Sequence, residues 1–370
     1  MNPIAIIIDN RQIHWDLIII LLAIPAWFFQ AHSLNAGSGG KRLASWLWLP
    51  FALVFGLFSS RMLFWYTHIE QYSSLSQALH DRSTESFSLL GILPGIVLAA
   101  VLVRLLRLTD DLPGFLDALS PATAMGLGLL YLADLFNYKC RGKFLVEGES
   151  LHHLPFASAV PGAGGEMEYR FATFFISFLM LMLISYICTE FFFLRKKEKG
   201  MTACLFLLLF SASEYVLDST RYDPEYFPFN GFVSILQIFA GLSVLGLTIY
   251  FSIRAIRRRG FRWYLIPIWL GVVASMTGCG VLEYLVQRYS DRHTQIYTWM
   301  SISAVGMVIF PYMLYTLGRK LKVTAPALSV AELPIVEKVV RRKRKRISIT
   351  RLDDTALEAF DEEALEILMD

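Results

Sequence analysis

The sequence predicts an all-α protein that crosses a membrane several times. Of its 370 residues, 55% are hydrophobic and only 18% are charged, and the mean hydropathy is +0.50. Soluble domains are rarely more than about half apolar, so this composition indicates a bilayer as the surroundings of the chain. No segment alternates between polar and apolar residues as the strands of a membrane barrel do, so the spanning elements are expected to be helices. Soluble enzymes and disordered chains are largely excluded, and the net charge of +3 is too small to indicate a nucleic-acid partner.

Nine apolar stretches are long enough to cross a hydrocarbon core of ~30 Å. The expected spans are 14–33, 43–67, 87–108, 117–137, 171–194, 201–219, 231–253, 262–286 and 294–317. No internal repeat relates them, so a transporter built from duplicated halves is not indicated. The four cysteines lie far apart and lack the spacing of metal ligands, so we predict no metal site and no other cofactor. The N-terminal residues lack a basic region and a cleavage site, so no removable signal peptide is expected.

The distribution of Lys and Arg predicts the orientation of the chain. These residues gather after the first, third, fifth, seventh and ninth stretches, at 41–42, 104–107, 195–199, 254–259 and beyond 319. Because cationic connections stay in the cytoplasm, the N-terminus is expected outside and the C-terminus in the cytoplasm. The longest outer connection, 138–170, is expected to form a small lid.

Residues 320–370 are expected to form a cytoplasmic tail. The tail holds a basic run at 341–346 and then an acidic segment with helical spacing of apolar residues at 355–368. We interpret the basic run as an anchor to anionic lipid, with docking of a cytoplasmic partner as the alternative.

Polar side chains inside the apolar stretches are the candidates for a functional site, because a charge at that depth costs several kcal/mol. Tyr131 and Asp134 share one helix face, and Glu214, Asp218 and Arg221 share another. At ~1.5 Å per residue, all candidates lie within ~10 Å of the outer ends of their helices. The candidates are Asp16, Arg61, Ser88, Tyr131, Asp134, Glu214, Asp218 and Arg221. This shared depth predicts one water-accessible cavity that opens on the outer side.

Each candidate also has a simpler interpretation. Asp16 and Asp134 would then lie among lipid headgroups, and Arg61 would extend its guanidinium toward them. Arg221 would be no more than an ion-pair partner within its own helix. Glu214 is the deepest and the hardest to explain in this way. Two further polar residues, Gln237 and Glu283, are expected to form hydrogen bonds between helices.

The order of these motifs resembles the prolipoprotein diacylglyceryl transferase family. The family's His-Trp-Tyr at the first helix is matched by His14, Trp15 and Asp16, and its arginine near the end of the second helix by Arg61. The matching segments are 13–16, 59–65, 87–91, 119–137, 154–156, 214–224 and 234–237. The resemblance implies a seven-helix core over residues 1–258, two additional transmembrane helices over 259–319 and a bacterial cytoplasmic membrane as the location.

Most of the family's polar site residues are replaced in this divergent sequence. Asp16 stands where the family has Tyr, Ser88 (or Leu89) where it has His, and Tyr131 where it has Arg. In the same comparison Asp134 replaces Asn, Glu214 replaces a second Arg, and Asp218 replaces Glu. Only Arg61 and Arg221 keep the family's cations at matching positions. Because the other replacements remove two arginines and add carboxylates, the expected cavity is acidic.

The resemblance implies transfer of a diacylglyceryl group from phosphatidylglycerol to the lipobox cysteine of a prolipoprotein. Asp218, Glu214, Tyr131 and Asp134 would be the catalytic residues; Arg61, Arg221, Asp16 and Ser88 would bind the lipid. Like charges ~4 Å apart repel by roughly 4 kcal/mol at an effective dielectric constant near 20, so an acidic cavity disfavours an anionic headgroup. Two alternatives stay open: an inactive protein that binds lipids or signal peptides, and a solute or ion pathway.

Overall fold

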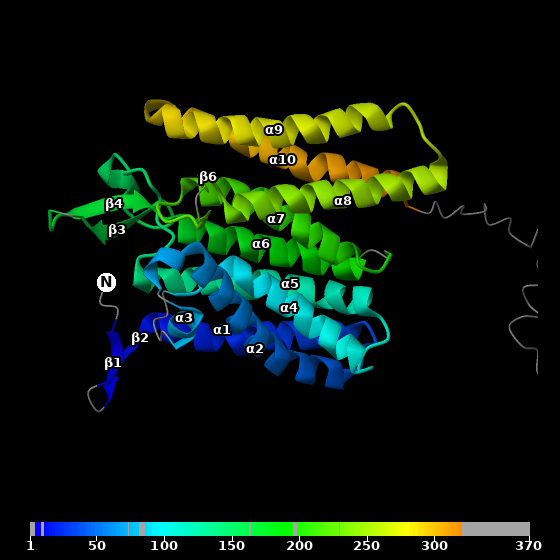
Figure 1. Cartoon of the computed structure of the whole chain (residues 1–370), viewed down its shortest axis with the longest axis horizontal. Coiled ribbons are helices and arrows are strands. Elements are labelled where there is room, and N and C mark those ends of the chain that lie inside the picture. Colours follow the sequence, from blue (N-terminus) through cyan, green and yellow to red (C-terminus); the bar gives the residue numbers. More distant parts are fainter. Residues whose placement is uncertain are drawn as a thin grey trace, which may run out of the picture. The chain divides into compact units, whose positions relative to one another are not determined.

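The computed structural model describes residues 4–8, 11–72, 74–80, 86–162, 164–194, 198–228 and 230–319. The predicted cytoplasmic tail therefore lies outside the described residues. Within them, a long helix occupies each of the nine expected spans (Figure 1). The nine helices are α1 (Trp15–Gly37), α2 (Arg42–Thr67), α4 (Leu89–Leu105), α5 (Leu112–Asn137), α6 (Thr173–Leu194), α7 (Met201–Thr220), α8 (Ile235–Arg259), α9 (Leu265–Arg288) and α10 (His293–Leu317).

The structure confirms the predicted fold class. Eight of the described helices are long and apolar enough to cross a membrane, and α4 is a shorter apolar helix of 17 residues. The expected span for α4 began two residues earlier and ran three residues longer, because Phe87 and Ser88 belong to the preceding connection. A short additional helix, α3 (Leu75–His80), lies in the connection between α2 and α4.

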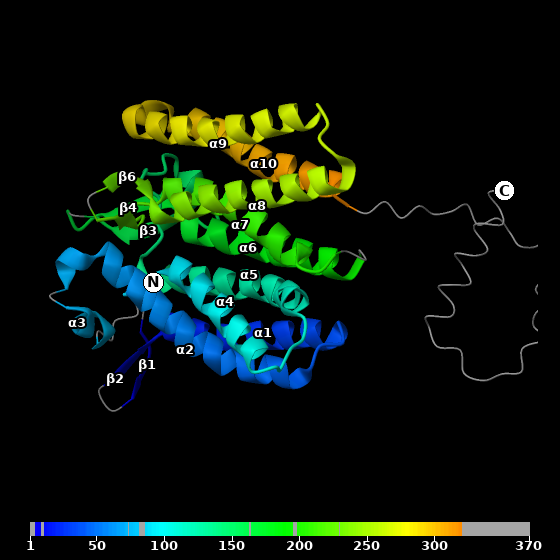
Figure 2. The same ribbon diagram turned by 45° about the vertical axis from the view of Figure 1, so that its right-hand side comes forward.

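Among the described residues, three two-stranded antiparallel sheets lie at one end of the helices, which we call the hairpin end (Figures 1 and 2). They pair β1 (Ile4–Ile8) with β2 (Arg11–His14), β3 (Ala157–Pro161) with β4 (Met167–Phe171), and β5 (Tyr226–Phe227) with β6 (Asn230–Ser234). The sequence analysis did not predict these strands. The connection expected as a lid, 138–170, holds β3 and most of β4.

Helices α2 and α4 approach each other closely because glycine lines the contact. A Cβ on Gly95 would lie 2.4 Å from the backbone nitrogen of Gly56, and a Cβ on Gly91 would lie 2.6 Å from the Cα of Ser60. Small residues let helix backbones pack closely where lipid gives no hydrophobic drive to association. This contact holds the start of α4, next to Ser88, against the last part of α2.

The central helix α5 packs against α1 on one side and α6 on the other. Helices α9 and α10 lie at one edge of the bundle, where α10 packs on α7 and α8, and α1 and α2 lie at the opposite edge (Figures 1 and 2). Buried side chains from α7 to α10 form one apolar cluster, which includes Tyr215, Val244, Val272 and Met300. Residues 1–319 form one compact unit, and the division of this unit at residue 258 stays a prediction.

Candidate functional site

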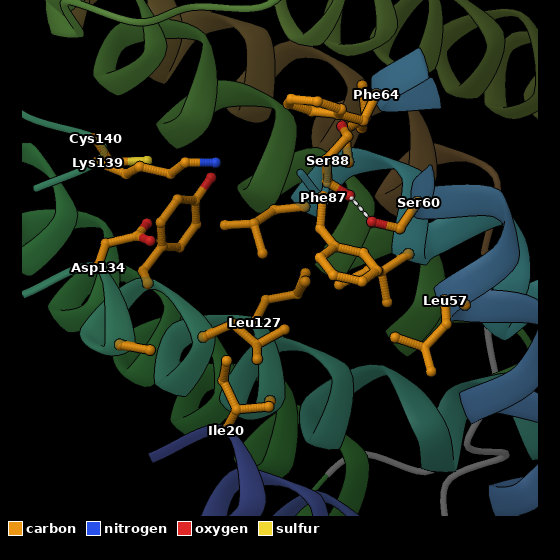
Figure 3. A pocket seen from close by; sticks show the side chains of 18 of the residues that line it. Ile20, Leu57, Ser60, Phe64, Phe87, Ser88, Leu127, Asp134, Lys139 and Cys140 are labelled. Carbon is orange, nitrogen blue, oxygen red and sulfur yellow. Dashed lines mark hydrogen bonds between the residues drawn. The ribbon is translucent and has the colours of Figure 1, made fainter. Parts of the chain in front are cut away.

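A cavity of about 670 Å³ lies between α1, α2, α4 and α5 and reaches the ends of α7 and α8. Its lining divides into an apolar part and a polar part, which faces the hairpin end. Figure 3 labels apolar lining residues, Ile20, Leu57 and Leu127, and polar lining residues, Ser60, Ser88, Asp134, Lys139 and Cys140. A cavity with one apolar and one polar end fits an amphipathic molecule.

A buried charge cluster forms the wall of the polar part. Arg221, which directly follows α7, places its guanidinium 2.9 Å from Glu214 Oε2 and 3.2 Å from Asp218 Oδ1. It also donates a hydrogen bond to the Tyr131 hydroxyl, which in turn donates to Glu214 Oε2 at 2.8 Å. All four side chains are at least nine-tenths buried, so the pairs are shielded from screening by solvent. The cluster joins α5 to α7 across the bundle.

Hydrogen bonds continue from this cluster to α9. The Ser234 hydroxyl donates to Asp218 Oδ2 and accepts from the backbone nitrogen of Gln237 at 3.1 Å. The Gln237 side chain completes a capping box at the start of α8 and donates through Nε2 to Glu283 of α9 at 3.0 Å. The predicted interhelical role of Gln237 and Glu283 is thus confirmed. Helix α9 therefore supports the start of α8, where Ser234 binds Asp218.

A further carboxyl group, Glu225, enters the cavity from the connection between α7 and β5. The Ser88 hydroxyl donates to Glu225 Oε2 at 2.5 Å, while the Ser88 carbonyl accepts from the Ser60 hydroxyl at 2.7 Å (Figure 3). Burial raises the pKa of Glu225 to about 7. This group can therefore exchange a proton near neutral pH.

The end of α5 and the connections that follow α5 and α7 supply the remaining polar wall. Asp134 accepts a hydrogen bond from Asn137 at 3.0 Å, and Asp223 accepts one from the backbone nitrogen of Cys140 at 3.2 Å. Burial raises the pKa of the Cys140 thiol well above its usual range, so this thiol stays protonated and is a poor nucleophile. No group of His, Cys, Asp and Glu among the described residues is arranged to hold a metal ion.

The comparison with family models matches residues 3–253 to the prolipoprotein diacylglyceryl transferases. This match spans well over half of the chain. The chain belongs to the prolipoprotein diacylglyceryl transferase family. The comparison with curated proteins gives no match. Membership supports a transferase-like function in general, a phospholipid and a prolipoprotein as the kinds of partner, and a multi-pass membrane location. The match ends within α8, so α9 and α10 lie beyond the family region.

The structure brings most of the predicted site residues of this transferase family member to one place. Those that line the cavity are Ser88, Tyr131, Asp134, Asp218 and Arg221. Glu214 lies directly behind Tyr131 and Arg221 and is 0% exposed. The expectation that helix spacing gathers these side chains therefore agrees with the geometry, while their catalytic and binding roles stay predictions.

Two predicted residues of the family site do not line the cavity among the described residues. Arg61 stacks over the Phe87 ring at 3.9 Å and is buried, so its guanidinium does not extend to an exposed position. Asp16 is 2% exposed and accepts a hydrogen bond from the Leu17 backbone at 2.8 Å, in the first turn of α1. Asp16 therefore satisfies one of the N–H groups that a helix start leaves unpaired.

The sequence analysis missed several polar residues that line the cavity. Those with ionisable side chains are His68, Lys139, Cys140, Asp223 and Glu225. All of them lie in connections just beyond helix ends, whereas the search looked inside apolar stretches. The polar segment that follows each helix on the hairpin side is the signal that could have identified these residues.

Proposed function

We propose that this member of the family binds a diacyl phospholipid in the cavity and transfers its diacylglyceryl group weakly or not at all. The apolar part of the cavity would hold acyl chains, and the polar part would hold the headgroup. The observation that carries the proposal is the pairing of Arg221 with both Glu214 and Asp218. A guanidinium already engaged by two carboxylates has little positive charge left for a phosphate group.

Active transfer is the second candidate, and the Glu225 carboxyl favours it. Attack of the thiol on the diacylglyceryl carbon that carries the phosphate forms a carbon–sulfur bond and breaks the bond from that carbon to the phosphate oxygen. Glycerol phosphate leaves, and the thiol proton must go to a base. A carboxyl group with a pKa of about 7 that lines the cavity meets this requirement. In this case Asp218 or Glu225 would accept the proton, and Lys139 and Arg221 would face the phosphate.

The orientation of the chain is part of the proposal. The hairpin end, with the polar part of the cavity, would face the outside of a bacterial cytoplasmic membrane. Support comes from the cations at the opposite end of the helices, where Lys41 and Lys199 lie in connections and Arg104 and Arg258 lie in the last turns of α4 and α8. A cysteine introduced at Ser158 in β3 should react with a membrane-impermeant reagent in intact cells. A reporter fused after Asp370 should be cytoplasmic; labelling of the Ser158 cysteine only after permeabilisation would refute this orientation.

Lipid binding and transfer can be measured on the same purified protein. We expect diacyl lipid in organic extracts of the protein, and little mass increase of a lipobox peptide in phosphatidylglycerol vesicles. Leu57→Trp fills the cavity and should reduce lipid retention several-fold, whereas Leu98→Trp changes an equally exposed leucine that does not line it. Equal retention in both variants would refute binding in this cavity, and rapid peptide lipidation would show that transfer is the function.

A further inference from the structure

We propose that Trp27 limits the length of the acyl chain that the cavity accepts, so that the cavity selects lipids whose chains span one leaflet over lipids with longer chains. This inference rests on the proposed lipid binding and names which lipids the cavity takes. It comes from the apolar part of the cavity, away from the polar part described above. Figure 3 shows Ile20 and Leu127 on this apolar side, apart from Lys139 and Ser88.

The apolar part ends inside the bundle, near the middle of the four helices that surround it. The described lining residues farthest from the hairpin end are Trp27 of α1, Ala52 of α2, Ile96 of α4 and Thr123 of α5, which we call the cavity floor. Each helix continues well past its floor residue, so packing inside the bundle forms the floor. The Thr123 hydroxyl donates to the Leu119 carbonyl of its own helix at 3.0 Å, so an apolar chain end can lie against it without leaving that hydroxyl unpaired.

Aromatic side chains support the floor on the side away from the hairpin end. The Trp27 ring meets the Trp48 ring edge-on, with centroids 4.9 Å apart and planes at 74°. Trp48 is 0% exposed, packs against Phe115 at 90° and donates from its indole nitrogen to the Ile96 carbonyl at 3.5 Å. A Cβ on Gly126 would lie 3.1 Å from the Trp27 side chain, so the space beside the indole is also filled. The indole therefore has little room to move away from a chain that presses on it.

The depth of the apolar part corresponds to one leaflet. At ~1.5 Å per residue, the lining of α1 from Leu17 to Trp27 is about 15 Å long. The hydrocarbon core of a bilayer is ~30 Å thick, so one leaflet contributes about 15 Å. A chain that matches its leaflet would then reach the floor and fill the apolar part. A longer chain must bend or displace the indole, and a shorter chain leaves a void that loses packing contacts.

The test offers the protein a mixture of lipids that differ only in chain length. Purified full-length protein in detergent is incubated with equal amounts of dimyristoleoyl, dipalmitoleoyl, dioleoyl and dierucoyl phosphatidylglycerol, and native mass spectrometry counts each bound species. We expect the dierucoyl lipid, which has the longest chains, to bind at least about fivefold less than the dipalmitoleoyl and dioleoyl lipids, because overpacking of a filled space carries a penalty of this size.

Two substitutions should move the preference in opposite directions. Trp27→Ala removes the indole and should raise the ratio of bound dierucoyl to dioleoyl lipid about fivefold or more. Ile24→Trp adds an indole to the lining about one helical turn nearer the hairpin end and should shift binding toward the dimyristoleoyl lipid. Trp46→Ala is the matched control, because Trp46 is 58% exposed on α2 and lies outside the described lining.

The outcomes separate this proposal from the proposed function. Equal binding of all chain lengths by the wild type would overturn the length limit alone, as would a preference that neither cavity variant changes or that Trp46→Ala changes equally. Ile24→Trp decides the question by itself should Trp27→Ala fail to fold. Binding of none of these lipids would overturn the proposed function as well.

Discussion

Replacement of Arg221 by methionine should strongly destabilise the protein. The substitution leaves the carboxylates of Glu214 and Asp218 and the hydroxyl of Tyr131 without the guanidinium that contacts all three. Removal of one partner from a buried ion pair typically costs about 3–5 kcal/mol, because the remaining charge stays buried without compensation. For a protein of this size we expect the midpoint of thermal unfolding to fall by on the order of 10 °C.

Thermal unfolding in detergent, followed by the fluorescence of the eight tryptophans, measures this change. The control is Arg292→Met, because Arg292 lies 3.9 Å from Asp291 and both side chains are mostly exposed. An exposed pair contributes about 0–1 kcal/mol, so the control should unfold near the wild-type temperature. Addition of Glu214→Gln to Arg221→Met should recover part of the loss, since it removes one uncompensated carboxylate. Equal midpoints for the two arginine variants would refute the assignment of a buried charge cluster.

Three further substitutions have defined outcomes. Burial raises the pKa of Glu225 from 4.5 to about 7, so the stability of the wild type falls as the pH rises through this window. Relative to the wild type, Glu225→Gln should therefore gain roughly 1–3 kcal/mol of stability between pH 5 and pH 8. A constant difference in unfolding midpoint across this range would contradict the assignment. Glu283→Leu leaves the Gln237 amide without its acceptor and should lower the free energy of unfolding by about 1–3 kcal/mol, whereas Glu283→Gln should keep most of the stability. Equal unfolding midpoints for these two variants would argue against the link to α9. Gly95→Ala should cost about 1–3 kcal/mol by forcing α2 and α4 apart, while Gly246→Ala in α8, where an added Cβ meets nothing within 4 Å, should be neutral or slightly stabilising; similar unfolding midpoints for both would refute the close contact.

The spanning helices could be predicted from the sequence because each is an apolar segment with few charges. The contact between Tyr131 and Glu214 could be anticipated in part, since helix spacing puts Glu214, Asp218 and Arg221 on one face. The direction in which the polar residues of the connections point could not be predicted. Tyr138 and Cys140 adopt left-handed backbone conformations, with φ of 59° and 53°, which turn the chain just beyond α5 and direct Lys139 and Cys140 to the cavity. Neither residue is a glycine, so no local pattern announced that turn.

The hairpins were missed for a related reason. The strands that form them have two to five residues, too few for alternation of polar and apolar side chains to show. Asp16 illustrates the opposite case. Its position at the start of an apolar segment suggested the cavity, whereas it is absent from the described cavity lining and accepts a hydrogen bond from the backbone N–H of Leu17 in the first turn of α1.

The placement of three charges on one short stretch has a consequence for how this protein is made. Glu214, Asp218 and Arg221 belong to a single segment, and the arginine reaches both acids along that segment. An isolated charge at the centre of a helix opposes its passage from the translocation channel into lipid by about 2.5–3.5 kcal/mol. Because the cation and the acids arrive together, the segment can compensate part of its charge before it packs against a neighbouring helix. Tyr131 of α5, synthesised earlier, then offers the first polar contact that the inserted segment meets.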